Sequence, residues 1–222
     1  MAPTEIIVTG DGSHSLLNTE LNETYHSVHG ALRESQYVFI EQGLDYWMQR
    51  NANESACVLE IGFGTGLNAW LTLAYALQNA RSITYDTLET YPLPATIWTQ
   101  LNYGDDAAMR SRFEKLHALS WDVPHVLEER FMITKHYASI QDKAFSEKFD
   151  VIFYDAFAPS KQPDMWTFDV LCKITSALAP QGIFVTYCAK GQVKRDLRQL
   201  GLIVETLPGP PGKKEMVRVR NV

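Results

Sequence analysis

Short apolar runs alternate with longer amphipathic stretches along most of the chain, beginning near residue 56. The runs that we expect to form strands lie at residues 57–61, 84–88, 131–134, 151–154 and 183–187. Between them, apolar positions three and four residues apart predict helices at about residues 67–78, 93–101, 107–116, 163–178 and 193–200. This alternation predicts an α/β fold with an open, mostly parallel sheet that carries helices on both faces.

The last two apolar runs, at residues 202–204 and 216–219, lie too close together for a parallel connection. The segment between them, residues 206–215, holds three prolines and two glycines, so it cannot supply a crossover helix. The last strand is therefore expected to run antiparallel to its neighbour. Seven strands ending in an antiparallel hairpin are the plan of the Rossmann-like class I methyltransferases, and we predict this fold class.

The first 55 residues follow a different pattern. Residues 6–8 and 15–17 predict two short strands around a turn at residues 10–13, and a polar helical stretch follows from about Tyr25 to Arg50. We expect residues 1–55 to form an extension of hairpin and helix, packed on a methyltransferase domain that comprises residues 56–222.

Composition restricts the class of protein further. The 222 residues are 45% apolar and 21% charged, which is ordinary for one globular domain with a small appendage. No run of 18 apolar residues predicts a membrane span, and the N-terminus lacks the basic flank and apolar core of a secretory signal. The three cysteines lie in apolar runs without metal-ligand spacing, which predicts reduced, buried thiols, no metal site and a cytoplasmic protein.

The net charge of −6 at first argues against a nucleic-acid partner, because phosphate binding needs lysine and arginine. The charge is unevenly distributed, however. Residues 190–222 carry eight basic and three acidic groups, a net charge of +5, and the remaining 189 residues carry −11. This asymmetry predicts separate tasks for the two parts, so an RNA partner stays possible.

A glycine-rich loop follows the first strand of the regular region. Its sequence, Glu60-Ile-Gly62-Phe-Gly64-Thr-Gly66, stands where a strand ends and a helix begins, which is where ligands bind in open α/β sheets. A dinucleotide fingerprint would need glycine at the position of Leu67. Glu60 would also repel a diphosphate, whereas it suits the sulfonium and ammonium groups of S-adenosylmethionine.

Two more acids stand at predicted strand ends. Glu89 ends the second strand, where a carboxylate accepts both hydroxyls of a ribose. Asp155 ends the fourth strand, beside the glycine loop, where it could hold an ammonium group or take a proton from an incoming amine. Phe157 could stack on a flat substrate. For Trp166, packing within its helix is at least as good an interpretation.

With these residues in view, the sequence resembles the methyltransferase domain of the MnmC family of bifunctional tRNA-modifying proteins and its stand-alone relatives. The resemblance spans nearly the whole chain in order and rests on the following segments: Thr24-Tyr25-His26-Ser27 with Gly30-Ala31 and Glu34-Ser35, Val38-Phe39, LEIGFGTGLN at 59–68, YDAFAP at 154–159, PDMWT at 163–167, TYCAKG at 186–191 with Val193-Lys194-Arg195, and GPPGKKEM at 209–216.

The resemblance implies that S-adenosylmethionine methylates the aminomethyl group of 5-aminomethyl(-2-thio)uridine at the wobble position of tRNA. By position it implies that Asp155 faces the reacting amine and that Glu89 binds the ribose. It further implies that Glu60, Gly62, Gly64 and Gly66 hold the amino-acid end of the cofactor, and that Phe63, Asn68 and Asp155 also bind the cofactor. Where the family has a Gly-Asp-Ala-like turn near the adenine, this chain reads His136-Tyr137-Ala138-Ser139, so the adenine contact is left open.

Partners follow from this resemblance together with the charge distribution and the residues of the fourth strand's end. Tyr25 and Ser27 of the N-terminal motif are expected to close over the site, and Phe157 to contact the substrate. Basic residues of the C-terminal region are expected to contact phosphates of the anticodon stem-loop, namely Lys190, Lys194, Arg195, Lys213 and Lys214. The length leaves no room for an oxidase domain, so another enzyme is expected to supply the aminomethyl nucleoside.

Two other functions stay open on the sequence. The first is a methyltransferase that acts on a small-molecule or protein amine, which would share the fold and the cofactor. The second is a non-catalytic nucleotide-binding or scaffold protein, against which Glu60, the glycine loop, Glu89 and Asp155 argue together.

Overall fold

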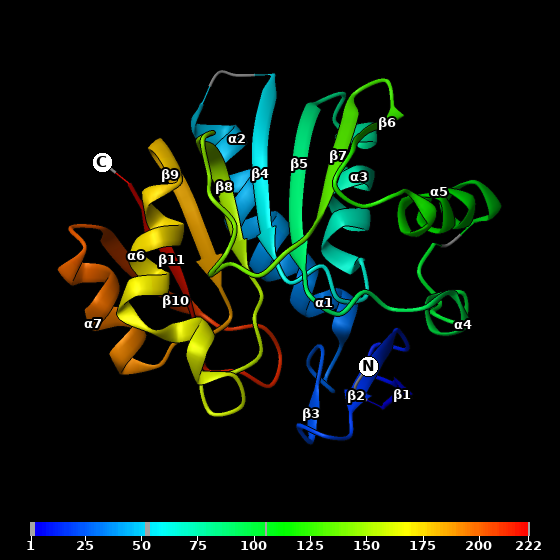
Figure 1. Ribbon diagram of the computed structural model, residues 1–222, viewed down its shortest axis with the longest axis horizontal. Coiled ribbons are helices and arrows are strands. Elements are labelled where there is room, and N and C mark those ends of the chain that lie inside the picture. Colours follow the sequence, from blue (N-terminus) through cyan, green and yellow to red (C-terminus); the bar gives the residue numbers. More distant parts are fainter. Residues whose placement is uncertain (1–2, 52–53, 105, 222) are drawn as a thin grey trace.

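A central sheet of eight strands organises the chain (Figure 1). The computed structural model describes residues 3–51, 54–104 and 106–221. The elements of the regular region are β4 (Ser55–Ile61), α3 (Leu67–Gln78), β5 (Ser82–Glu89), α4 (Ala95–Trp98), α5 (Ala107–Ala118), β6 (Pro124–Glu128), β7 (Phe131–Tyr137), β8 (Phe149–Tyr154), the 3-10 turn η2 (Pro163–Trp166), α6 (Phe168–Ser176), β9 (Leu178–Thr186), α7 (Gly191–Gln199), β10 (Ile203–Pro208) and β11 (Glu215–Arg220).

The strand order β10-β11-β9-β8-β4-β5-β7-β6 places the first strand of the regular region in the middle of the sheet. Strands β9, β8, β4, β5 and β7 pair in parallel, whereas β11 runs antiparallel to both β9 and β10. The predicted class I methyltransferase fold and its antiparallel final hairpin are therefore confirmed. The central strands β4 and β8 are almost wholly buried, as parallel strands covered on both faces must be.

The sheet has one strand more than the seven predicted. The additional strand, β6, pairs antiparallel with β7 at the edge of the sheet. It begins with a proline, and its central Val126 is 73% exposed. An edge strand buries little apolar surface, so it lacks the apolar run that marks the central strands.

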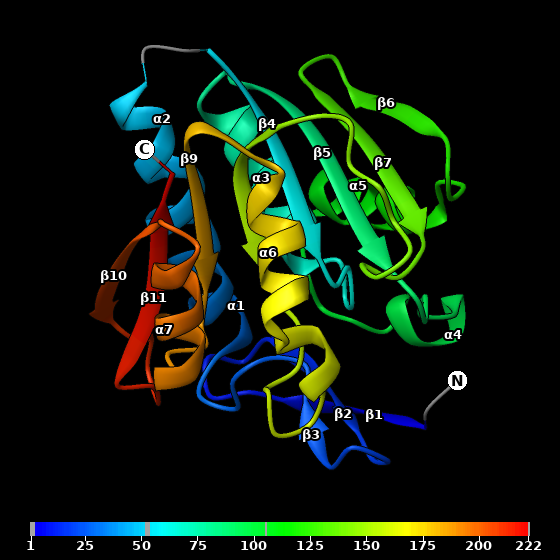
Figure 2. The same ribbon diagram turned by 60° about the vertical axis from the view of Figure 1, so that its left-hand side comes forward.

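Helices cover both faces of the sheet, as Figures 1 and 2 show. One face carries α3 and α5 together with a continuous helical stretch made of α1 (Ala31–Ser35), the π-helical segment η1 (Gln36–Asp45) and α2 (Tyr46–Arg50). The other face carries α6 and α7, so each face has its own apolar core. Two predicted helices are shorter than expected. Within residues 93–101 only Ala95–Trp98 is α-helical, and within residues 163–178 the α-helix comprises only Phe168–Ser176.

The N-terminal residues form a separate three-stranded sheet of β1 (Thr4–Val8), β2 (His14–Asn18) and β3 (Glu23–Thr24). This includes the predicted hairpin, because β1 and β2 pair antiparallel around residues 9–13. Figure 1 shows the small sheet beyond the ends of the arrows of β4 and β5. The boundary at residue 55 stays a prediction, and the helical stretch 31–50 packs closely on the central sheet.

The cysteines differ in part from the expectation of three buried thiols. All three are free thiols, but only Cys188 is buried, whereas Cys57 is half-buried and Cys172 is exposed. Cys172 lies on the solvent-facing side of α6. Its apolar neighbours in the sequence suggested burial, but they lie on the opposite side of the helix.

Candidate active site

A cavity of about 640 Å³ opens at the carboxyl edge of the parallel strands. Its wall combines the glycine loop, the ends of β5 and β8, the segment 138–141 and residues 18–26 of the N-terminal sheet. This size is typical of sites for small molecules and cofactors. The place agrees with the expectation that ligands of an open α/β sheet bind beyond the carboxyl ends of its strands.

The glycine loop turns the chain sharply from β4 into α3. Gly62, Gly64 and Gly66 all have positive φ angles, of 95°, 48° and 73°. At Gly66 the left-handed conformation coincides with close packing, since a Cβ atom there would lie 2.7 Å from Nε2 of His117. Glycine is therefore required at this position on two grounds. Gly62 and Gly64 line the cavity and Gly66 stands behind them.

Glu89 is held rigidly at the end of β5. One carboxylate oxygen accepts the backbone N–H of Gly64 at 3.0 Å, and the other accepts those of Thr90 and Tyr91 at 2.8 Å each. The side chain lines the cavity beside the glycine loop. A carboxylate fixed by three backbone donors retains acceptor capacity, so it can bind ribose hydroxyls without reorganising.

Asp155 and Asn68 form a polar pair at the inner end of the cavity. The Asn68 amide donates to Oδ2 of Asp155 at 2.9 Å, and both residues line the cavity wall. The amide oxygen of Asn68 is buried and has no hydrogen-bond partner within the described part of the chain. Burial raises the pKa of Asp155 to about 7, and Glu34 pushes it in the same direction. An unpartnered oxygen beside a carboxyl group is suited to an ammonium group.

Glu60 occupies a different position from the one expected. It is fully buried within β4 and does not line the cavity, and one of its oxygens accepts the hydroxyl of Thr87 at 2.7 Å. Burial raises its pKa to about 8, with the neighbouring Asp155 contributing. The carboxyl group therefore stands between the central strands, behind the cavity wall. A direct contact of Glu60 with the cofactor stays a prediction.

Aromatic side chains flank the opening. Tyr25 meets Phe157 edge to face, with ring centroids 5.1 Å apart, and both line the cavity. Tyr25 also lies against the glycine loop, since a Cβ atom on Gly64 would be 3.2 Å from its ring. Trp166 is buried, and its indole N–H donates to the carbonyl oxygen of Phe157 at 2.7 Å, so its role is packing. These contacts fix two aromatic rings in the cavity wall.

Comparison with known proteins identifies the class. A family model described as S-adenosyl-L-methionine-dependent methyltransferase matches residues 127–221. The crystal structure of MnmC2 from Aquifex aeolicus superimposes with a TM-score of 0.81 and 26% identity, covering all of this chain and 71% of that one. The chain is thus similar over its whole length to an MnmC methyltransferase structure.

Curated relatives agree with this similarity. The bifunctional MnmC proteins of Nitrosospira multiformis and Hydrogenovibrio crunogenus are 29% and 26% identical to the MnmC-like domain, over 91% and 90% of it. Both are described as tRNA 5-methylaminomethyl-2-thiouridine biosynthesis proteins. The chain spans about a third of their length. A more distant structure, the amino pentose methyltransferase CalS10 with bound S-adenosylmethionine, shares the fold at a TM-score of 0.50 and 10% identity.

The MnmC-like domain brings most of the predicted cofactor residues together. Those that line the cavity are Gly62, Phe63, Gly64, Asn68, Glu89 and Asp155. Ser27 does not line it, and its backbone N–H donates instead to the carboxylate of Glu34 at 2.6 Å. Ala138 and Ser139, which replace the family's Gly-Asp-Ala-like turn, do reach the cavity wall. The individual roles of these residues stay predictions.

The predicted RNA-binding residues divide into two groups. Lys190, Arg195 and Lys214 are exposed, and none of them forms an ion pair with another described residue. Lys194 is paired with Glu215 at 3.0 Å, and Lys213 is paired with the buried Glu34. Only the first group offers its full charge to a phosphate backbone.

Tyr187 and Lys161 are among the residues of the cavity wall that sequence reasoning missed. Tyr187 follows β9, and its hydroxyl donates to the carbonyl oxygen of Ala156 at 2.8 Å. The ammonium group of Lys161 donates to the carbonyl oxygens of Leu21 and Asn22, which ties the loop after β8 to the N-terminal sheet. Neither contact has a local sequence signal, because the partners lie 31, 140 and 139 positions away.

Within residues 3–51, 54–104 and 106–221, no helix has the length and apolar character that a bilayer crossing requires. The same residues contain no cluster of three or more histidine, cysteine or acidic side chains arranged for a metal ion.

Proposed function

We propose that this domain methylates the aminomethyl group of 5-aminomethyl(-2-thio)uridine at the wobble position of tRNA, giving 5-methylaminomethyl(-2-thio)uridine. The observation that carries the proposal is the structural match to MnmC2, over all of this chain and 71% of that one, together with a cavity that holds Asp155 beside the glycine loop. The described relatives are biosynthetic proteins for that nucleoside.

The residues present fit S-adenosylmethionine. Glu89 would accept its ribose hydroxyls, and the glycine loop with Asn68 would hold its amino-acid end, where a buried amide oxygen lacks a partner. When bound, this cofactor supplies an electrophilic methyl group on a sulfonium ion. Its positive charge also suits a domain whose first 189 residues carry −11.

The chain's own residues would do three things for the reaction. Tyr25 and Phe157 would hold the uridine base at the opening, after it has left the stack of its loop. The cavity would align the amine, because transfer to nitrogen depends mainly on position. The nitrogen must give up one proton, and the Asp155 carboxylate would accept it.

A surface beside the cavity would bind the anticodon stem-loop. Lys190 precedes α7, in the short segment that follows β9, and Lys214 lies in the loop between β10 and β11. Figure 1 shows this loop at the edge of the sheet where the strands that line the cavity end. Exposed basic groups there would contact phosphates. A tRNA substrate implies a cytoplasmic protein and an upstream enzyme that makes the aminomethyl nucleoside.

The test is nucleoside mass spectrometry of tRNA incubated with the protein and labelled S-adenosylmethionine. The tRNA is taken from cells that lack the methylated nucleoside. We expect label in 5-methylaminomethyl(-2-thio)uridine and loss of the aminomethyl precursor. Cofactor binding without any labelling of tRNA would contradict the proposal and favour a small-molecule or protein amine as the substrate.

A further inference from the structure

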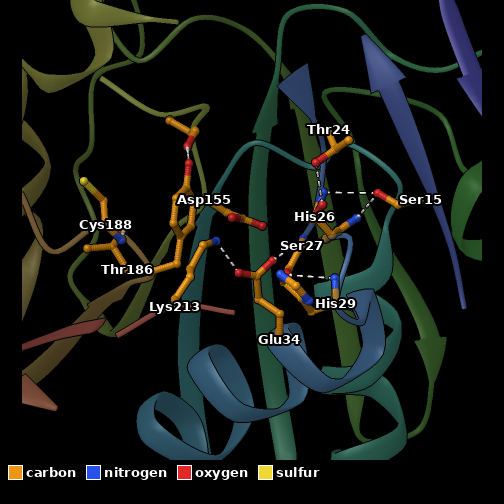
Figure 3. Close-up of polar contacts among 12 residues, drawn as sticks. Ser15, Thr24, His26, Ser27, His29, Glu34, Asp155, Thr186, Cys188 and Lys213 are labelled. Carbon is orange, nitrogen blue, oxygen red and sulfur yellow. Dashed lines mark hydrogen bonds and ion pairs between the residues drawn. The ribbon is translucent and has the colours of Figure 1, made fainter. Parts of the chain in front are cut away.

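A partly buried ion pair lies beside Asp155 and has no role in the function proposed above. The ammonium group of Lys213 donates to Oε1 of Glu34, and the backbone N–H of Ser27 donates to the other oxygen at 2.6 Å. Glu34 is only 4% exposed. Figure 3 shows Lys213 and Glu34 joined next to the side chain of Asp155. The two partners lie 179 positions apart in the chain, so the pair joins the N-terminal helix to the C-terminal hairpin.

The pair is also connected, through Tyr187, to the segment after β8 that contains Asp155. The Lys213 ammonium group lies 3.8 Å from the centroid of the Tyr187 ring, a cation–π contact. The hydroxyl of Tyr187 in turn donates to the carbonyl oxygen of Ala156, the residue after Asp155. Lys213 therefore touches both a buried acid and the ring that fixes the backbone next to the proposed proton acceptor.

The loop that carries Lys213 is docked on the molecule. A Cβ atom on Gly212 would lie 1.9 Å from Cδ2 of His29, so only glycine permits this approach, and φ there is +86°. At the start of the loop, the hydroxyl of Tyr37 donates to the carbonyl oxygen of Pro208 at 3.0 Å. The position of the Lys213 charge is thereby fixed by contacts on both sides.

Stability alone does not account for such a pair. Glu34 is removed from water and Lys213 is partly removed, and this costs free energy that their attraction often fails to recover, so the pair is weak evidence of a stabilising role. Its place next to a carboxyl group gives it an electrostatic effect. Glu34 raises the pKa of Asp155 and Lys213 lowers it, in addition to burial, which raises it, and the Asn68 hydrogen bond, which lowers it.

Three further ionisable groups lie close enough to Asp155 for its charge to raise their pKa values. They are Glu60 of β4, Tyr85 of β5 and Tyr187 after β9. Burial raises the pKa of each of these three groups, so they are uncharged near neutral pH. Of the groups named here, Glu34 and Lys213 are the ones that carry charge next to Asp155.

We propose that Lys213 is a positioning residue for methyl transfer: held by Glu34 over the Tyr187 ring, it offsets the negative charge of Glu34 and keeps Asp155 in the carboxylate form that accepts the proton of the amine. The proposal rests on the proposed function for the identity of the reaction. It assigns Lys213 a task at the site, in place of a phosphate contact.

The direct test is the titration of Asp155, followed by NMR in protein labelled with ¹³C-aspartate and assigned with Asp155→Asn. We expect Lys213→Met to move the midpoint upward, on the order of one pH unit, because Glu34 then acts alone. Glu34→Gln should move it downward, and Lys213→Arg should keep it near the wild-type value. Arg112→Gln is the matched control, since it breaks the ion pair between Arg112 and Glu128, which joins α5 to β6.

An unchanged midpoint in both Lys213→Met and Glu34→Gln would overturn the proposal, as would an equal shift in Arg112→Gln. If Lys213→Met fails to fold, the opposite shift in Glu34→Gln and the wild-type behaviour of Lys213→Arg still decide the question. The titration needs no RNA, so a wild-type protein that methylates no tRNA would contradict the proposed function and leave this result standing.

The pH dependence of single-turnover methyl transfer gives a second readout. In Lys213→Met the rise of the rate with pH should move to higher pH, in step with the Asp155 midpoint. A purely structural role predicts instead a lower rate at every pH with the rise unmoved, and that outcome would count against the positioning role.

Discussion

At the residue scale, two carboxyl groups differ in their access to the cavity: Glu60 is fully buried in β4, whereas Asp155 follows the adjacent strand β8 and is partly exposed. Burial raises the pKa of Glu60 to about 8 and that of Asp155 to about 7. Glu60 is closed off between strands and accepts the Thr87 hydroxyl, whereas Asp155 faces the cavity and accepts the Asn68 amide. A general base must be within reach of the substrate and must titrate near the working pH. Asp155 meets both conditions.

Replacing Asp155 by asparagine should lower the single-turnover rate of methyl transfer at neutral pH by about 10²-fold. In the wild type, the rate should rise with pH through about 7, because the carboxylate forms over that range. The Asp155→Asn protein should lose this rise. The measurement is transfer of labelled methyl groups to tRNA over a range of pH, with Asp169→Asn on the exposed start of α6 as the control. A pH profile that keeps its rise in Asp155→Asn would assign the proton to another group.

At the element scale, the parts predicted from sequence are those set by local pattern. The glycine loop, Glu89 and Asp155 were placed correctly relative to one another, because the carboxyl ends of parallel strands meet at one edge. The burial of Glu60 and the pairing of Lys213 with Glu34 were not predicted, since each depends on which distant segment packs there. Strand β6 was missed because an exposed edge strand carries no continuous apolar run.

The buried Glu60 links β4 to β5 through Thr87, and it should make stability depend on pH. Its pKa is raised from 4.5 to about 8 in the folded state, so between these values the folded protein binds a proton that the unfolded chain does not. The contribution of this group to stability is therefore fully present below 4.5 and is lost as pH rises through about 8.

Glu60→Gln removes this titration. The melting temperature of the variant minus that of the wild type should therefore increase with pH, by on the order of 5 °C at a pH of about 8. Thermal unfolding followed by circular dichroism at several pH values measures both melting temperatures. Taking their difference removes the effect of the other ionisable groups, which are the same in the two proteins. Glu54→Gln, at an exposed position next to β4, is the control. A difference between Glu60→Gln and wild type that stays constant with pH would show that Glu60 is ionised in the folded protein.

At the scale of the whole molecule, the excess positive charge of residues 190–222 is partly used inside the protein. Arg218 and Arg220 both pair with Glu205, Lys194 pairs with Glu215 and Lys213 with Glu34. Four exposed basic residues of this region form no ion pair with another described residue, namely Lys190, Arg195, Arg198 and Lys214. The basic surface available to RNA is therefore smaller than the eight basic residues of this region suggest. Lys190 and Lys214 belong to it.

Reversing two of these charges, Lys190→Glu with Lys214→Glu, should weaken tRNA binding and leave the affinity for S-adenosylmethionine unchanged, because neither residue lines the cavity. The plot of the logarithm of the tRNA association constant against the logarithm of salt concentration should become less steep by about 1 to 2, as two phosphate contacts are lost. Lys115→Glu with Lys148→Glu changes the net charge equally at exposed positions on α5 and just before β8, and is the control. Equal weakening by both pairs would mean that tRNA responds to net charge alone. A change in slope confined to the first pair would place the RNA backbone beside the cavity, where a wobble base can reach Asp155.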